Sequence, residues 1–123
     1  MPMRRMLLIV SALAGLALAP IALSQRASRA ETRFQEANRK ETIDGDLKAA
    51  IDLYRRAISE AGSNRAIAAQ AWLRMGQCYE KLGDAEARKA YQQIVTSYGD
   101  QAAIVAQARS RSRARSLRTK ATL

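Results

Sequence analysis

The strongest constraint on the fold is an internal repeat with an interval of 37 to 38 residues. The segment 66–71, Ala-Ile-Ala-Ala-Gln-Ala, recurs at 103–108 as Ala-Ile-Val-Ala-Gln-Ala, and the same interval of 37 pairs Tyr54 with Tyr91. Other matched residues lie 38 apart, as a one-residue difference in turn length would produce. Repeats of this length indicate stacked units that each contribute one supersecondary element, so the fold is predicted to be an array.

Each repeat unit is predicted to contain two helices. In residues 65–82 the apolar and small side chains recur three and four positions apart, which places them on one face of a helix. The composition agrees, because 48% of the chain is apolar, only 5% is aromatic, and the apolar part is mostly alanine and leucine. Both residues favour helices, and small side chains let helices approach closely. The fold class is therefore predicted to be all-α.

A glycine followed by an aspartate marks the turn inside each unit. Gly45-Asp46 and Gly83-Asp84 occupy equivalent positions of the two units. The glycine can adopt the left-handed conformation that ends a helix, and the aspartate can cap the helix that follows. By the same reasoning the second unit is predicted to end at Gly99, with Asp100 as the cap of the last helix.

The repeat has a recognisable signature. Trp72-Leu-Arg-Met-Gly-Gln-Cys-Tyr79 resembles the W-x2-L-G-x2-Y pattern of the tetratricopeptide repeat, with methionine for leucine. The Ala-x3-Tyr segments at 50–54 and 87–91 resemble the A-x3-F of that family, with tyrosine for phenylalanine. The resemblance covers residues 31–108 and fades beyond them, where Arg109 and Arg113 stand at signature positions. The residues that carry it are Phe34, Gly45, Ala50, Tyr54, Trp72, Met75, Gly76, Tyr79, Gly83, Ala87 and Tyr91.

The resemblance implies a short right-handed array of two helix pairs and a C-terminal capping helix. The period is longer than the usual length of about 34 residues, which looks like the repeats of exported proteins of the bacterial cell envelope. In this family the first helices of each pair line a concave groove that binds a protein segment. Carried over to this chain, the groove residues are Gln35, Arg39, Gln70, Leu73, Arg74, Gln77 and Glu80.

The N-terminal segment has the parts of a secretory signal. Arg4 and Arg5 precede an uncharged apolar run at 6–23, and small residues allow cleavage before Gln25 or before Glu31. The alternative is an uncleaved membrane anchor, since 18 apolar residues are just long enough to span a bilayer. The predicted organisation is a signal peptide at 1–24, a linker at 25–30, a helical domain at 31–115 and a flexible basic tail at 116–123.

The net charge of +10 is concentrated at the two ends of the chain. Between Glu31 and Gln101 eleven basic residues balance eleven acidic ones. The C-terminal patch could bind an anionic membrane or polymer, or it could be a solvated helix end. Export and the lack of aromatic residues among these arginines argue against nucleic acid. The patch consists of Arg109, Arg111, Arg113, Arg115, Arg118 and Lys120.

The sequence predicts no catalytic residue, cofactor or metal. The chain has no histidine and a single cysteine, Cys78, on the small-residue face of a predicted helix, so it is interpreted as a buried structural thiol. Without histidine a Cys-His nucleophile cannot form, and one thiol with scattered carboxylates does not make a tetrahedral metal site. The aspartates at the turns are explained by capping.

These features predict a non-catalytic protein–protein interaction or scaffold module of the periplasm or cell envelope. Its protein partner is not identified by the sequence. The alternative is binding of an anionic membrane or polymer through the basic tail, with further membrane contact through 6–23 if the signal is not cleaved. Two units and a cap are fewer than such arrays usually need, so self-association or stabilisation by a partner is expected.

Overall fold

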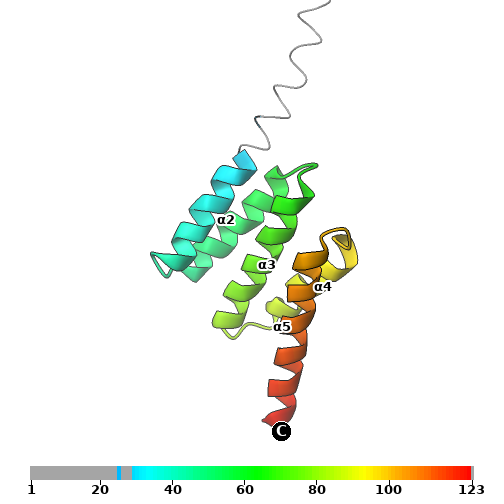
Figure 1. Cartoon of the computed structure of the whole chain (residues 1–123). Helices are drawn as coiled ribbons and strands as arrows, with labels where there is room; N and C mark the ends of the chain where they lie inside the picture. The colour runs from blue at the N-terminus through cyan, green and yellow to red at the C-terminus, as the bar shows by residue number, and fades with distance from the viewer. Residues whose placement is uncertain (1–24, 26–28, 123) are drawn as a thin grey trace, which may run out of the picture.

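The computed structural model describes residue 25 and residues 29–122, and within them the chain forms helices joined by short turns (Figure 1). The first helix covers 29–42; it is followed by α2 (Leu47–Glu60), α3 (Arg65–Lys81), α4 (Glu86–Ser97) and α5 (Ala102–Ala121). No strand occurs in these residues. The predicted all-α helical repeat of two helix pairs with a further C-terminal helix is confirmed. The predicted signal peptide at 1–24 lies outside the described residues, as do positions 26–28 of the linker.

The helices stack in chain order, and α3 is central. It contacts α2, α4 and α5, whereas α5 contacts only α3 and α4 among these elements. The C-terminal half of α5, red in Figure 1, projects beyond the other helices. Its helix continues to Ala121 without a break at 115, so residues 116–121, which were predicted to lie in the tail, belong to α5. The first helix includes residues 29 and 30, which were predicted as linker.

The glycines of the two Gly-Asp turns adopt the predicted left-handed conformation. Gly45 and Gly83 adopt positive φ angles of 66° and 69°, a conformation that glycine reaches without steric cost. The Asp46 carboxylate accepts the Ala49 amide at 3.0 Å and caps α2. The N-cap of α4 is Ala85, not Asp84 as predicted. The Asp84 carboxylate still accepts the Glu86 amide at the start of α4, at 2.9 Å. These turns therefore fix where the second helix of each pair begins.

The predicted cap at Asp100 is wrong. The N-cap of α5 is Gln101, which makes no side-chain capping bond, and Gly99 does not adopt a positive φ. The Asp100 carboxylate binds Arg65 at the start of α3, with 2.7 Å between Oδ1 and Nη2. The Arg65 guanidinium also lies 4.9 Å from the ring centroid of Tyr98. Because a charged partner is within reach, the carboxylate joins two helices instead of capping one.

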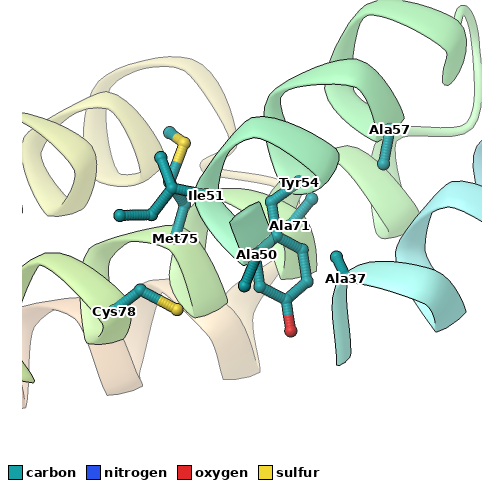
Figure 2. Packing of buried hydrophobic residues seen from close by; sticks show 8 residues of the cluster. All are labelled: Ala37, Ala50, Ile51, Tyr54, Ala57, Ala71, Met75 and Cys78. Atoms are coloured by element: carbon teal, nitrogen blue, oxygen red, sulfur yellow. The ribbon is translucent and has the colours of Figure 1, made fainter. Parts of the chain in front are cut away.

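Small side chains dominate the core. Eleven of the nineteen buried apolar residues in the described part are alanines, which allows the helices to approach closely. One cluster joins the first helix, α2 and α3, and Figure 2 shows Tyr54 lying among its alanines. The Phe34 ring lies 5.5 Å from the Tyr54 ring, centroid to centroid. The buried residues of this cluster are Ala37, Ala50, Ile51, Tyr54, Ala57, Ala71, Met75 and Cys78.

A second cluster joins α3, α4 and α5. Its buried members are Leu73, Ala87, Tyr91, Ile94, Val105 and Ala108. Trp72 and Tyr79 are half-buried and pack against both clusters. A Cβ atom at Gly76 would lie only 2.6 Å from Cε1 of Tyr91, so glycine is required for this contact. The signature residues therefore pack α3 against its two neighbouring helices.

Candidate protein-binding groove

A groove runs between the first helix, α3 and α5. It contains a cavity of about 470 Å³ that is lined by polar and charged residues. Because the first helix, α3 and α5 are equivalent members of successive units, the groove is the face that the repeat pattern generates. Its lining residues are Glu41, Thr42, Arg74, Gln77, Glu80, Lys81, Arg111 and Arg118.

The carboxylate of Glu41 forms the most buried contact of the groove. Its side chain is only 1% exposed. It accepts the Tyr54 hydroxyl at 2.7 Å and pairs with Arg74 and Lys81, each at 3.1 Å. A buried carboxylate is stable only when charged and hydrogen-bonding partners compensate its lost hydration, and three do so here. These four residues are called the Glu41 cluster below.

The same arrangement recurs one unit later around Glu80. This carboxylate accepts the Tyr91 hydroxyl and lies 3.7 Å from Arg111 and 3.8 Å from Arg118. In both clusters the tyrosine comes from the second helix of the unit, and the two cations stand seven residues apart on the next groove helix. The Glu80 side chain is 13% exposed, so this second cluster is looser and more hydrated. These four residues are called the Glu80 cluster.

Burial is the main cause of the raised pKa values of three side chains near the groove. It raises the pKa of the Tyr54 hydroxyl, and it raises the pKa of Tyr91 in the same way. Burial, with the charge of Glu41 as the next cause, raises the pKa of the Cys78 thiol to about 12. The thiol is fully buried and stays protonated at neutral pH, which agrees with its interpretation as a structural residue.

The predicted groove residues divide into three groups. Arg74, Gln77 and Glu80 line the cavity together. Gln35, Arg39 and Gln70 are exposed but do not line it. Leu73 is only 5% exposed and belongs to the second core cluster, so its assignment to the groove is wrong. The Leu73 side chain packs against α4 and α5, because burying a large apolar side chain is more favourable than leaving it exposed to water.

The predicted basic patch divides between two faces of α5. Arg111 and Arg118, seven residues apart, contact Glu80 and line the groove. The other four, Arg109, Arg113, Arg115 and Lys120, line a separate cavity between α4 and α5. The groove and the patch, which the sequence presented as alternatives, therefore share one helix.

Among the groove residues that the sequence interpretation missed, which also include Thr42 and Lys81, Glu41 is the most buried. It lies seven residues after Phe34 and four after Ala37, the spacing that places all three on one helix face. A charged residue on an apolar face is the signal that could have identified it. Its partners could not have been found in this way, because they come from α2 and α3.

Groups that could hold a metal are absent from the residues that the structure describes. No three histidine, cysteine, aspartate or glutamate side chains gather there in a suitable arrangement. Within the same residues, no helix has the length and apolar character needed to cross a bilayer. The predicted apolar run at 6–23 lies outside this part of the chain.

The fold and groove define a helical-repeat protein with a concave surface. Residues 70–100 match the family model of the tetratricopeptide repeat. Over these residues the match supports the tetratricopeptide-repeat family that the signature predicted. Comparison with curated proteins gave no match, and neither did comparison with solved structures. Tetratricopeptide repeats typically mediate protein–protein interactions and generally act as non-catalytic scaffolds.

Proposed function

We propose that this chain is an exported, non-catalytic adaptor of the bacterial cell envelope that binds a protein segment in the groove. The main support for the proposal is the way in which the groove is built. Equivalent helices of successive units supply it, and its cavity has room for side chains of a ligand. The N-terminal Arg4-Arg5 pair and the apolar run at 6–23 support export.

The charges of the groove favour a ligand with mostly neutral hydrogen-bonding groups. Arg74 and Lys81 are paired with Glu41, and Arg111 and Arg118 lie close to Glu80. A carboxylate ligand would have to compete with these internal partners for the cations. Thr42 and Gln77 offer uncharged polar groups in the same cavity. A polar peptide segment therefore fits the groove better than a strongly acidic one.

The groove can be tested by filling it. The variant Thr42→Arg/Gln77→Arg places two long side chains in the cavity. Its matched control is Thr96→Arg/Gln93→Arg, at two exposed positions of α4. The hydroxyls of Thr42 and Thr96 make the same bond, 2.8 Å long, to the carbonyl four residues earlier, so the two variants change similar local structure.

Tagged protein and both variants would be used to capture partners from envelope extracts, with quantitative mass spectrometry as the readout. We expect one or more proteins to be retained by the wild type and the control and lost from the groove variant. Retention of every captured protein by the groove variant would exclude the groove as the working surface.

Export can be tested separately. We expect cell fractionation to place the protein in the periplasm or envelope, with a mature mass that corresponds to a chain beginning at Gln25. A mature chain beginning at Glu31 would still support a cleaved signal. A cytosolic protein of full-length mass would contradict export without bearing on the groove.

A further inference from the structure

The face of α5 that points away from the groove is equivalent to the face of α3 that packs against α4. The interval of 37 pairs Gly76 with Arg113 and Tyr79 with Ser116. On α3 these positions are covered, since the Tyr91 ring lies against Gly76 and Tyr79 packs against the second core cluster. On α5 both positions line an open cavity whose other wall is α4, and no further helix of the described residues fills it.

This cavity lies between α4 and α5 and has a volume of about 860 Å³. Its wall on α4 includes the half-buried Val95 and the edge of Tyr91, which give it an apolar strip. Its wall on α5 carries serine, threonine and basic side chains, whose methylene stems extend the apolar surface. The lining residues are Ala85, Arg88, Tyr91, Gln92, Val95, Arg109, Ser112, Arg113, Arg115, Ser116, Thr119 and Lys120.

The charge of the cavity has one sign. It is lined by five cations and no carboxylate, and none of the five forms an ion pair within the described part of the chain. Such a surface attracts a negatively charged partner and repels a positive one. The cations are Arg88, Arg109, Arg113, Arg115 and Lys120.

We propose that the α4–α5 cavity binds an acidic amphipathic helix of a partner protein, which lies against α5 as α4 lies against α3. The helical form follows from the repeat, because a helix already fills the equivalent surface of α3. The acidic character follows from the five cations. Arg113 at the position of Gly76 further selects against a helix with an aromatic residue like Tyr91 at the closest contact.

A second copy of this chain fits the cavity less well. Several carboxylates of the first helix and α2 are paired with cations of the same two helices, as Glu36 and Glu60 are with Arg33. Asp44 pairs with Lys40, and Asp52 pairs with Arg55. These helices of a second copy would therefore bring a cation together with each of these four carboxylates. A separate acidic helix would bring no cations close to the five cations of the cavity.

The site differs from the groove of the proposed function, so each can fail without the other. Its test uses the full chain and a fluorescein-labelled synthetic peptide of about 20 residues, long enough for several helical turns. The peptide has glutamates on one face and an alanine–leucine seam on the other. A scrambled peptide of identical composition has the same charge but no amphipathic face. Binding is measured by fluorescence anisotropy at about 50 mM salt.

Each of two matched variants removes two positive charges from one face of α5, and the two variants change different faces. Arg109→Gln/Arg113→Gln changes the cavity, and Arg111→Gln/Arg118→Gln changes the groove by the same net charge. All four positions are exposed, and glutamine is a good helix former, so both variants are expected to fold. Circular dichroism checks this. Arg109→Lys/Arg113→Lys retains the charge and is expected to restore binding.

We expect the cavity variant to bind the amphipathic peptide about tenfold more weakly than the wild type, which corresponds to about 1.4 kcal/mol. The groove variant should bind within about threefold of the wild type, because it changes only long-range electrostatics. The Thr42→Arg/Gln77→Arg variant should also bind the peptide. This result would show that the peptide does not bind in the groove.

Equal losses in the two charge variants would overturn the proposal, since non-specific attraction would then explain the binding. Equal affinity for the scrambled peptide would overturn the helical requirement and with it the proposal. A third contrary outcome concerns lipids. If neither peptide binds, while vesicles rich in phosphatidylglycerol retain the wild type and release the cavity variant, the cations recognise a membrane surface instead.

Discussion

Helices α3 and α5 occupy the same position in successive units, yet within the described residues only α3 has helices packed on both sides. Toward the groove the two helices behave alike. Each presents two cations, seven residues apart, to a carboxylate of the preceding groove helix. Away from the groove they differ, because α4 packs against Gly76 of α3, whereas Arg113 stands at the equivalent position of α5.

The comparison shows that the two faces of a groove helix have separate structural roles. The groove face holds the ion-pair pattern that links one unit to the next. The opposite face determines whether another helix packs there, and a few residues suffice to change it. Exchanging residues between α3 and α5 should therefore disrupt the fold in one direction and alter it little in the other.

The largest effect is expected from giving α3 the residue of α5. Gly76→Arg would place a long charged side chain where even a Cβ atom lies 2.6 Å from the Tyr91 ring. Overpacking together with burial of a charge should lower the free energy of unfolding by at least about 3 kcal/mol. Urea titration followed by circular dichroism measures the loss. A Gly76→Arg protein as stable as the wild type would refute the close-packed contact.

A difference in thiol reactivity should also separate the two helices. Cys78 on α3 is equivalent to Arg115 on α5. Burial raises the pKa of Cys78 to about 12, so its thiol should react with a disulfide reagent at pH 8 roughly a thousandfold more slowly than an ordinary thiol. A Cys78→Ala/Arg115→Cys protein should react at the ordinary rate, because its thiol lies on the half-exposed face of α5. Similar rates for the two proteins would contradict the difference in burial.

The reverse exchange, Arg113→Gly in α5, should cost only about 1 kcal/mol of unfolding free energy, through the low helix propensity of glycine. No contact like that between Gly76 and Tyr91 exists there among the described residues. Arg113→Ala is the control, and it should unfold at nearly the same urea concentration as the wild type. A loss from Arg113→Gly as large as that from Gly76→Arg would mean that α5 is covered in solution.

The smallest effect concerns the link between the starts of the two helices. Hydrogen bonds from Arg65 hold the pKa of Asp100 well below its usual range. Because the folded-state pKa is lowered, the stabilisation is present above the unfolded-state pKa and is lost as the pH falls toward the folded-state value. The melting temperature of the wild type should therefore fall more between pH 5 and pH 3, about the range where free aspartate titrates, than that of Asp100→Asn. Parallel pH profiles for the two proteins would argue against this contribution.

Sequence reasoning succeeded where one residue determines a local conformation. Gly45 and Gly83 adopt the left-handed conformation, and Asp46 caps α2, because each effect acts within a few residues. It failed at Gly99 and Asp100, although the same local pattern is present there. The reason is that Arg65, thirty-five residues away in sequence, provides a stronger partner for the carboxylate.

The groove was predicted in part for the same reason. The family pattern identified Arg74, Gln77 and Glu80, whose places follow from their position on the repeat. It misplaced Leu73, because which side of α3 is covered depends on how α4 and α5 pack. The charge count along the chain assigned Arg111 and Arg118 to a basic tail. Such a count does not show which face of a helix each residue occupies.

The buried carboxylate of Glu41 has a consequence for how the domain assembles. The first helix supplies the charge, but α2 supplies the Tyr54 hydroxyl and α3 supplies Arg74 and Lys81. An intermediate with only the first two helices docked would leave the carboxylate without a cation, at a cost that its other contacts do not offset. The first three helices are therefore expected to fold in a single cooperative step, with no stable pair of helices before it.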